Sequence, residues 1–511
     1  MSTSVMLNPP FESAAVDGGR NAEQSVTADL PFRRFAATPQ VATATEAIVQ
    51  KMRRAGLPEL MIQTFCFYYD KLVAGESGYI HNTEAQPVAT LPTAEALTEE
   101  HKAIGQEMLD RVIYLKLNGG LGTSMGMQGP KSLLPAKDRL RFLDVIVQQV
   151  MHLRKAYNVR LPLILMNSFS TERETLAALE EQHEFGQDIP LSFLQHKEPK
   201  IWKADLWPAE WPTDPAKEWC PPGHGDLYAA LTTSGLLQRL LDEGYTYAFV
   251  SNSDNLGATL DLKILGYVAK HEVPFLMEVA ARTAADRKGG HLAQRPDGQL
   301  ILREIAQCPE EELASFQDID RYRYFNTNNL WIHLPTLQRL LQERNGILGL
   351  PLIRNEKPID PTLPDSERVY QLETAMGSAI ASFAGAGALE VPRSRFVPVK
   401  KNNDLLVLWS DLYLLTAENN LAVNPARAER GYSDLPLLLL DERYYQLIDD
   451  VRSRFPHGAP SLLDCEELHI EGDVTFGRDV VICGKVQIIN SGEEPLHVAD
   501  GTRLENTELR R

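Results

Sequence analysis

The stretch from residue 115 to residue 137, LKLNGGLGTSMGMQGPKSLLPAK, holds five glycines behind a short apolar run and places Lys131 after them. Glycine at this density predicts a very tight turn or a ligand that lies against bare backbone. Backbone N–H groups at the end of a strand bind phosphate, and a following lysine adds a point charge. The stretch therefore predicts a phosphate-binding loop; the alternative is a strand-to-helix turn that merely needs glycine.

Two familiar phosphate loops do not fit this stretch. A Walker A loop needs Gly-Lys-Ser/Thr, whereas Pro130 stands directly before Lys131. A dinucleotide fingerprint needs the spacing G-x-G-x-x-G, and Gly120, Gly122 and Gly126 are one residue out of that register. The loop is expected to bind phosphate through the same kinds of group, backbone N–H groups and a lysine, but with a geometry of its own.

A carboxylate and a cluster of cations elsewhere could complete such a site. Asp254 follows the apolar run YAFVSN, so a strand would end beside a carboxylate able to hold Mg²⁺ while water and phosphate oxygens take its other positions. The alternative for Asp254 is a local Asx turn. The segment PRSRFVPVKKNND concentrates cations in an acidic protein, and its alternative is a solvated basic loop; these cations are Arg393, Arg395, Lys400 and Lys401.

Alternating strands and helices are predicted to position these groups. The apolar runs VIYLKLN, LPLILMNS, IPLSFLQ, YAFVSNSD and PFLMEVA predict strands, and helix-like stretches lie between the first four of them, at 142–156, 171–184 and 226–243. This alternation predicts a mostly parallel sheet covered on both faces, with ligands at the carboxyl ends of the strands.

Composition narrows the class of protein. The chain has 511 residues, a net charge of −18 and five scattered cysteines without a Cys-x-x-Cys pair. The acidic balance argues against a nucleic-acid partner, and no stretch approaches the ~20 apolar residues that a membrane span needs. The start lacks the charged-then-apolar order of a signal peptide. We expect a cytoplasmic protein that binds neither nucleic acid nor membrane.

The chain is expected to fold as several parts. Residues 43–75 have apolar residues at helical intervals with a break at Gly56-Leu57-Pro58, and a further helix is predicted with Thr93 as its cap. The predicted parts are a flexible arm at 1–40, a helical lead-in at 41–110, a catalytic domain at 111–410 and a C-terminal domain at 411–511.

The last fifty residues have a period of six. Two apolar series run through them, the first made of Leu462, Leu468, Val474, Val480 and Val486, and the second of Ile470, Phe476, Ile482 and Ile488. A hexapeptide period with paired inward residues is typical of a parallel β-helix. The alternative is a plain run of hairpin strands.

The wording of the glycine loop, LNGGLGTSMGMQGPKS, resembles the signature of the eukaryotic-type UTP–glucose-1-phosphate uridylyltransferases. LMNSF (165–169), PPGHGD (221–226), SNSDNLGA (251–258), FNTNNLW (325–331), QLETAMGSAI (371–380), VPRSRFVPVK (391–400) and GDVTFG near the end are similar to that family too, in order. The resemblance runs from about residue 100 to the end. It implies an α/β, Rossmann-like nucleotidyltransferase domain with a mixed, mostly parallel sheet, followed by a left-handed parallel β-helix.

The reaction implied by the resemblance joins UTP and glucose 1-phosphate into UDP-glucose and pyrophosphate, reversibly and with Mg²⁺. A sugar-phosphate oxygen attacks the α-phosphorus in line, and no covalent enzyme intermediate forms. Such chemistry needs cations, a metal-binding carboxylate and backbone donors.

The resemblance also implies roles for individual residues. Gln195 stands where the family keeps a base-reading glutamine, although its neighbours depart from the family wording and a surface glutamine is the alternative. Lys400 aligns with the family's second phosphate-binding lysine, and Lys401 is this chain's own variation. The implied nucleotide site comprises Leu117, Asn118, Gly119, Gly120, Lys131, Gln195, Gly223, Asp254 and Lys400, with Lys131, Lys400 and Asp254 catalytic and Asp254 holding the metal. The implied sugar-phosphate site comprises His224, Asn252, Ser253, Gly290, Glu304, Asn328 and Asn329.

Other functions remain open at this point. A broader UDP-sugar pyrophosphorylase would also accept galactose 1-phosphate, and a catalytically inactive protein could serve as a UDP-glucose sensor. The presence of Lys131, Asp254 and Lys400 together speaks against the sensor. The misregistered glycines disfavour a dehydrogenase. The exposed end of the β-helix is a candidate surface for contacts between copies of the chain.

Overall fold

The computed structural model describes residues 39–180, 186–283 and 286–511. The arm predicted at 1–40 lies outside these residues except for its last two, which begin helix α1 (Pro39–Arg54). Helix α2 (Glu59–Val73) follows after a break at Gly56–Pro58, as predicted. The next helix, α3 (Glu99–Met108), is capped by Thr98 and not by Thr93: the Thr98 N–H donates to Nδ1 of His101, whereas the residues after Thr93 form only a single 3₁₀ turn.

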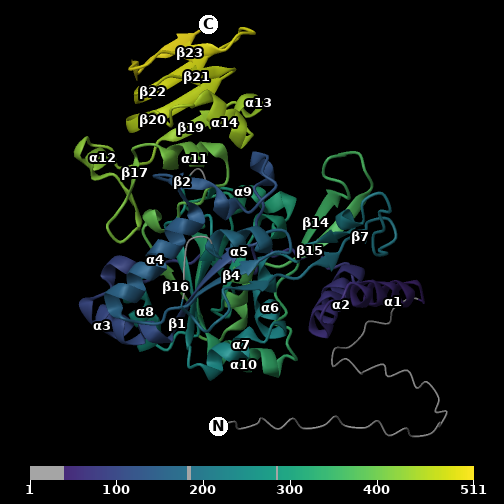
Figure 1. The fold of residues 1–511 in the computed structure, drawn as a ribbon. Coiled ribbons are helices and arrows are strands. Elements are labelled where there is room, and N and C mark those ends of the chain that lie inside the picture. The colour runs from purple at the N-terminus through teal and green to yellow at the C-terminus, as the bar shows by residue number, and fades with distance from the viewer. Residues whose placement is uncertain (1–38, 181–185, 284–285) are drawn as a thin grey trace, which may run out of the picture.

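A nine-stranded sheet forms the centre of the molecule (Figure 1). Its strands run in the order β12-β11-β13-β9-β1-β4-β5, and β10 joins β13 to β16. Strands β5, β4, β1 and β9 are parallel to one another, whereas β13 is antiparallel to both β9 and β10. The nine strands are β1 (Val112–Asn118), β4 (Leu163–Asn167), β5 (Ser192–Leu194), β9 (Tyr247–Asn252), β10 (Phe275–Ala281), β11 (His291–Gln294), β12 (Leu300–Arg303), β13 (Tyr324–His333) and β16 (Gly387–Glu390). All five apolar runs predicted as strands belong to this sheet.

Helices cover both faces of the sheet because alternate residues of each central strand point to opposite sides. In β1, Val112 and Tyr114 enter one hydrophobic core, while Ile113 and Leu115 enter the other. Helices α4 (Phe142–Tyr157) and α8 (Leu262–Lys270) pack into the first core, and α6 (Leu227–Thr233), α7 (Leu236–Asp242) and α10 (Leu334–Glu343) pack into the second. The central part is therefore a three-layer α/β structure.

Two predicted helices differ in extent from the structure. The single helix expected at 226–243 is two helices, α6 and α7, because Gly235 between them has a left-handed φ of 72° that a regular helix cannot contain. Helix α5 (Glu172–Glu180) corresponds to the helix expected at 171–184 but begins one residue later, and residues 181–184 lie outside the described residues.

Smaller elements extend from the sheet. Strands β14, β15 and β7 form a side arm near α1 and α2, visible at the right of Figure 1. The remaining elements before residue 400 are β2 (Pro135–Lys137), β3 (Leu140–Arg141), β6 (Glu198–Pro199), β7 (Ile201–Trp202), β8 (Trp219–Cys220), α9 (Leu313–Phe316), β14 (Ile353–Pro358) and β15 (Arg368–Glu373). No helix among the described residues is long and apolar enough to cross a membrane.

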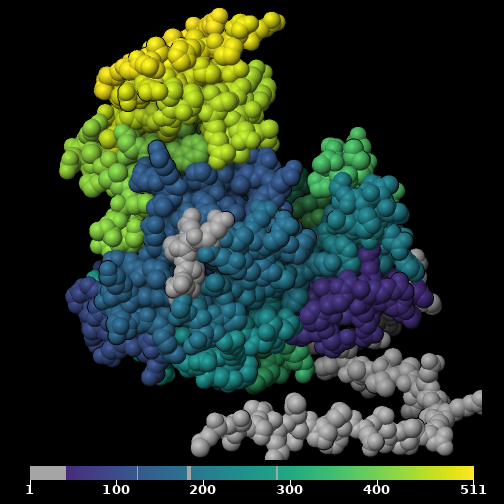
Figure 2. Space-filling model, in the orientation of Figure 1, coloured from purple at the N-terminus to yellow at the C-terminus, as the bar shows by residue number. Residues whose placement is uncertain are grey.

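The C-terminal residues, yellow in Figure 2, stack on the central part around a third core. Strands β19, β20, β22 and β24 pair in parallel, as do β21 and β23. Every member of the two apolar series with a spacing of six residues is buried. The elements here are α11 (Asn402–Trp409), β17 (Tyr413–Leu415), β18 (Leu421–Val423), α12 (Pro425–Glu429), β19 (Leu437–Leu440), α13 (Glu442–Tyr445), α14 (Ile448–Arg454), β20 (Ser461–Glu471), β21 (Val474–Phe476), β22 (Val481–Ile489), β23 (Leu496–Val498), β24 (Arg503–Glu505) and β25 (Glu508–Arg510).

Candidate active site

The carboxyl ends of four neighbouring strands meet at one edge of the sheet. Asn118 pairs in register with Asn167, Asn167 pairs with Leu194, and Leu117 pairs with Asn252. The side chain of Asn118 donates to Asn167 Oδ1 at 2.8 Å and to Thr175 Oγ1 at 3.0 Å, so it holds two strand ends together. A ligand at this edge would then meet the backbone of Asn118 and not its amide.

The glycine loop leaves the sheet at this edge and returns to it. The Lys131 N–H donates to the carbonyl of Gly120 at 3.2 Å, and Leu121 forms a β-bridge with Pro130. The carbonyl of Gly119 accepts a hydrogen bond from Ser168 Oγ at 3.0 Å. These contacts close the loop, so Lys131 lies beside the strand end from which the glycines depart.

Lys131 and Asp254 form an ion pair at the centre of the edge. Lys131 Nζ lies 2.8 Å from Asp254 Oδ2, and both side chains are largely buried. Asp254 belongs to the loop after β9, where the Ser253 N–H donates to the carbonyl of Leu117 at 3.0 Å. The half-buried Asn252 ends β9 beside them. The structure thus joins the predicted glycine loop and the predicted metal-binding carboxylate.

Lys400 is brought to the same place by backbone contacts. The Val399 N–H donates to the carbonyl of Asp254 at 3.2 Å, and the exposed ammonium group of Lys400 lies 5.9 Å from the centre of the Phe396 ring. Lys401, in contrast, pairs with Glu442 at 2.5 Å.

The two arginines of this segment are also paired. Arg393 forms two hydrogen bonds with the carboxylate of Asp286, and Arg395 forms two with that of Glu278. Within the described residues, Lys400 is therefore the cation of this segment with no carboxylate at ion-pair distance.

Gln195 lies between two glycines of the predicted nucleotide site. Its Nε2 donates to the carbonyl of Gly223 at 3.1 Å, and a Cβ on Gly119 would lie 2.7 Å from its Oε1. Gly223 has a φ of 77°, and a Cβ there would lie 2.5 Å from the carbonyl oxygen of Thr374. Gln195 is thus half-buried at the edge and hydrogen-bonded to the Gly223 loop, and its role in reading a base stays a prediction.

A hydrogen-bonded pair that the sequence did not suggest supports Gln195. The His196 N–H donates to Asp226 Oδ2 at 2.7 Å, and His196 Nδ1 lies 2.8 Å from Asp226 Oδ1. Both side chains are nearly completely buried. The pair ties the end of β5 to the start of α6, directly beside Gly223 and His224. No local pattern in the sequence pointed to this pair, because its partners lie 30 positions apart.

His224 is held as a neutral ring. Its Nδ1 accepts a hydrogen bond from the Met376 N–H at 2.9 Å, which places the ring proton on Nε2. Burial lowers the pKa of His224 to about 4. Near neutral pH the side chain can therefore donate one hydrogen bond to a ligand without carrying a charge.

Gly290, Glu304 and Lys400 form a second group at the edge. A Cβ on Gly290 would lie 2.5 Å from Glu304 Oε2, and the carbonyl of Gly290 accepts from the Asn326 N–H at 3.0 Å. Burial raises the pKa of Glu304 to about 7, although the positive charge of Lys400 opposes the shift. Glu304 is consequently a carboxyl group that can donate or accept a hydrogen bond near neutral pH.

The two predicted asparagines of β13 differ in their surroundings. Asn328 is half-buried with a φ of 58°, and its side-chain oxygen accepts from Asn326 Nδ2 at 2.8 Å. Asn329 is completely buried, and its amide donates to Glu278 Oε2 at 3.0 Å. The structure places Asn328 near Gly290 through Asn326, whereas Asn329 lies beneath the edge.

Lys116 is a buried cation that the sequence did not single out. Its Nζ donates to Ser251 Oγ at 2.8 Å and to the carbonyl of Ala258 at 3.0 Å. Burial, together with the charge of Arg395, lowers its pKa to about 7, while Asp254 opposes the shift. Lys116 therefore braces the loop of Asp254 from below. Its position inside an apolar run concealed it in the sequence.

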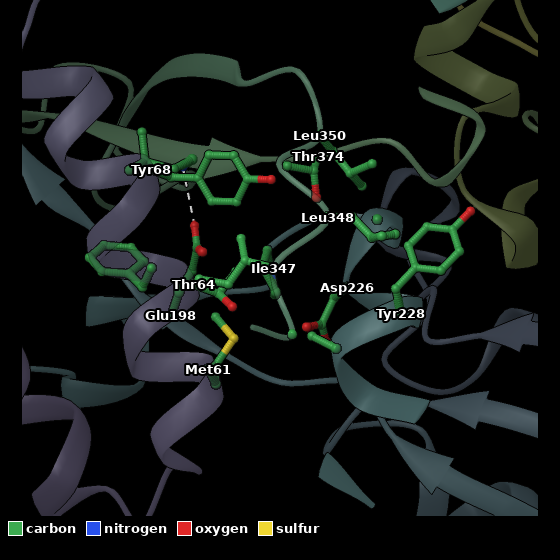
Figure 3. A pocket seen from close by; sticks show the side chains of 16 residues that line it. Met61, Thr64, Tyr68, Glu198, Asp226, Tyr228, Ile347, Leu348, Leu350 and Thr374 are labelled. Carbon is green, nitrogen blue, oxygen red and sulfur yellow. Dashed lines mark hydrogen bonds between the residues drawn. The ribbon is translucent and has the colours of Figure 1, made fainter. Parts of the chain in front are cut away.

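A small cavity lies between α2 and the start of α6 (Figure 3). It has a volume of about 40 Å³, and its lining includes Thr64 and Tyr68 of α2, Glu198, Asp226 and Thr374. Burial raises the pKa of Glu198 well above its ordinary value. This volume accommodates a few water molecules but no nucleotide.

The donor set fits Mg²⁺ held by a single protein carboxylate. Among the described residues, no group of three or more His, Cys, Asp or Glu side chains is arranged to hold a metal ion. Mg²⁺ is commonly bound by one or two carboxylates together with water and substrate phosphates. Asp254, beside the glycine loop and Lys131, suits that mode.

The carboxyl edge of the parallel sheet holds exposed loop backbone, two lysines and a carboxylate. This arrangement is typical of α/β enzymes of the nucleotide-binding class. The family model for UTP--glucose-1-phosphate uridylyltransferase matches residues 62–483. The chain is 38% identical over 448 residues to the UTP--glucose-1-phosphate uridylyltransferase of Solanum tuberosum, covering 86% of this chain and 90% of the relative. It is 35% identical over 494 residues to UTP--glucose-1-phosphate uridylyltransferase 2 of Dictyostelium discoideum, covering 96% and 94%.

A solved structure agrees with these relatives. A mutant of the UDP-glucose pyrophosphorylase from Leishmania major, in complex with UDP-glucose, has a TM-score of 0.86 and 43% identity, covering 92% of this chain and 99% of that one. The chain belongs to the UTP--glucose-1-phosphate uridylyltransferase family.

Proposed function

We propose that this chain transfers the uridylyl group of UTP to glucose 1-phosphate. A phosphate oxygen of the sugar phosphate forms a bond to the α-phosphorus of UTP, the bond from that phosphorus to the bridging oxygen breaks, and pyrophosphate leaves. UDP-glucose is the other product, and the reaction is reversible. The observation that carries the proposal is the convergence of Lys131, Asp254 and the Lys400 segment at the edge that also holds Gln195.

Uridine recognition is assigned to the glycine loop and Gln195. Uracil presents two acceptors that flank one donor, and a side-chain amide can match one acceptor–donor pair. The Gln195 amide is already aligned by Gly223 and by the buried His196–Asp226 pair. The backbone from Leu117 to Gly120 would border the base and the ribose.

Charge neutralisation is assigned to Lys131, Lys400 and Asp254. Lys131, at the return of the glycine loop, would contact the phosphates of UTP, and Lys400 would approach from the other side of Asp254. Mg²⁺ held by Asp254 would supply further positive charge to the phosphates. Transfer of this kind depends on positioning and electrostatic stabilisation, so the protein needs no nucleophile.

Sugar-phosphate binding is assigned to the remaining groups of the edge. His224 would donate its Nε2 proton to phosphate, with Asn252 and Ser253 beside Asp254 orienting the substrate. Gly290 and Glu304 would contact sugar hydroxyls. A sugar epimer with a misplaced hydroxyl would leave a buried polar group of the site unpaired and would therefore bind more weakly. The half-buried Asn328 would lie near the sugar. Asn329 would support the site from beneath through its hydrogen bond to Glu278.

The C-terminal part is proposed to be a left-handed parallel β-helix. Leu468 pairs in parallel with Val486 and Ile470 with Ile488, each three six-residue steps along the chain, which supports a coil with three sides. Val480→Asp would bury an unpaired charge in this core and should cost several kcal/mol. A soluble Val480→Asp variant with native size and melting temperature would contradict the assignment.

We also propose that the protein is cytoplasmic and that copies of the chain associate through the end of this domain. All five cysteines are buried thiols, as suits a reducing compartment. Terminal coils of such domains present open strand edges, which favour contacts with another chain.

The function is tested by pyrophosphate release from UTP, Mg²⁺ and glucose 1-phosphate, with galactose 1-phosphate in parallel. Release with glucose 1-phosphate at a much higher kcat/KM supports the proposal. Comparable rates with both sugars would instead identify a broader UDP-sugar pyrophosphorylase. Binding of UDP-glucose with no pyrophosphate release would identify the catalytically inactive sensor.

A further inference from the structure

We infer that Asn255 is a positioning residue for this reaction, because its amide joins the segment that carries Lys400 to the loop that carries Asp254. The inference rests on the role proposed above for Lys400. Asn255 follows Asp254 directly and is almost completely buried, so it does not contact the substrate itself.

Both hydrogen-bonding groups of the Asn255 amide are used by the Lys400 segment. Its Nδ2 donates to the carbonyl of Arg395 at 3.1 Å, and its Oδ1 accepts from the Val397 N–H at 2.9 Å. Asn255 also forms an isolated antiparallel bridge with Pro398. One further backbone bond, from the Val399 N–H to the carbonyl of Asp254, continues this pairing up to the residue before Lys400.

The other end of the segment is fixed in the sheet. Arg395 forms two hydrogen bonds of 2.7 Å with the carboxylate of Glu278, a completely buried residue of β10. The same carboxylate accepts from Trp331 Nε1 at 2.9 Å and from Asn329 Nδ2 at 3.0 Å. The segment is thus held rigidly at Arg395 and then aligned residue by residue along the Asp254 loop.

This arrangement explains how Lys400 can be held near Asp254 although Lys131 already pairs with that carboxylate. Asp254 already pairs with Lys131, so a second ammonium group gains little from Asp254 and is repelled by Lys131. The contacts made by Asn255 are uncharged and do not depend on that balance. They hold the backbone next to Lys400 near Asp254 while its side chain remains free to meet a phosphate.

The test compares kcat and the KM for UTP in Asn255→Ala, Lys400→Ala and the double variant. We expect Asn255→Ala to lower kcat about 10- to 100-fold with the KM for UTP within about threefold of the wild type. If Asn255 acts through Lys400, the double variant should have a kcat within about threefold of Lys400→Ala alone.

Two further variants separate positioning from loss of stability. Asn490→Ala is the matched control, because the buried Asn490 amide also holds backbone groups, donating to Asp473 and Glu494 and accepting from Gly492, but in the C-terminal part. It should lower the melting temperature by a similar amount and leave kcat within about twofold. Asn255→Ser keeps a hydroxyl that can donate or accept a hydrogen bond and buries no charge. It should retain more of the kcat than Asn255→Ala, and it covers the case in which the alanine variant does not fold.

Three results would overturn the inference. A multiplicative loss in the double variant would mean that Asn255 acts through some other group, such as Asp254. A wild-type kcat in Asn255→Ala alongside an impaired Lys400→Ala would show that the contacts of Asn255 are not needed. A wild-type kcat in Lys400→Ala would remove the proposed role of Lys400, while pyrophosphate release by the wild-type protein would still support the proposed reaction.

Discussion

Lys131 and Asp254 lie 2.8 Å apart at the carboxyl edge of the sheet, although 123 positions separate them in the chain. Each follows one of two adjacent parallel strands, β1 and β9, so the pairing of those strands brings the two side chains together. The pair joins the cation proposed to bind phosphate and the carboxylate proposed to bind the metal, so that their charges neutralise each other. A bound phosphate could replace Asp254 as the anionic partner of Lys131, and Mg²⁺ could replace Lys131 as the cationic partner of Asp254.

Lys131→Ala should lower kcat and also weaken UTP binding, because this lysine is placed to contact the phosphates before and during transfer. Loss of one positioned charge typically costs about 10²–10³ in rate. Steady-state kinetics with Lys155→Ala, an exposed lysine of α4, as control would measure the effect. An unchanged KM for UTP would contradict a ground-state contact.

Lys400→Ala should lower kcat by a similar factor with little change in the KM for UTP, since an interaction made mainly in the transition state appears in kcat. Lys401→Ala is the matched control: its side chain pairs with Glu442, so its rate should stay within about twofold of the wild type. The variant with both Lys400→Ala and Lys401→Ala should have the same kcat as Lys400→Ala alone. A Lys400→Ala variant that raises only the KM for UTP would make the segment a static clamp.

Glu304 should make stability depend on pH near neutrality. Its pKa is about 7 in the folded protein, against an ordinary value of 4.5, so the folded state retains a proton that the unfolded state has lost. The favourable contribution is complete below the unfolded pKa and is lost as pH rises through about 7. Thermal unfolding of Glu304→Gln should therefore lack this loss between about pH 4.5 and 7.5. Parallel curves for variant and wild type would contradict the assignment.

His224 should contribute in the opposite direction. Its pKa falls from 6.5 to about 4 on folding, so the stability contribution of the neutral ring is present above pH 6.5 and is lost as pH falls through about 4. NMR titration of the His224 ring should show no protonation between about pH 8 and 5. A midpoint near 6.5 would mean that the ring is solvated and that Met376 does not fix its tautomer.

The sequence predicted the groups that follow strands better than those that support them. Apolar runs located β1 and β9, and the polar residues after them identified Lys131 and Asp254. The helix at 226–243 was wrong in one respect, since Gly235 divides it. Thr93 was wrong as a helix cap, because Thr98 satisfies the start of α3.

The supporting contacts could not be predicted because their partners are far apart in the chain. His196 pairs with Asp226 across 30 positions, and Arg395 pairs with Glu278 across 117. A histidine or a buried glutamate has no local pattern that names its partner. Lys116 occurs within an apolar strand, where its hydrogen bonds to Ser251 and Ala258 depend on how β1 and β9 pair.

The central claim, uridylyl transfer at the Lys131–Asp254 edge, is tested most directly by the Mg²⁺ dependence of pyrophosphate release in Asp254→Asn. The substitution keeps the size of the side chain and removes the charge that would hold the metal. We expect the variant to fold with a near-native melting temperature, to lose about 10²-fold or more in kcat and to lose the steep rise of rate with Mg²⁺ concentration. A folded Asp254→Asn enzyme with the wild-type rate and the wild-type Mg²⁺ response would contradict the claim.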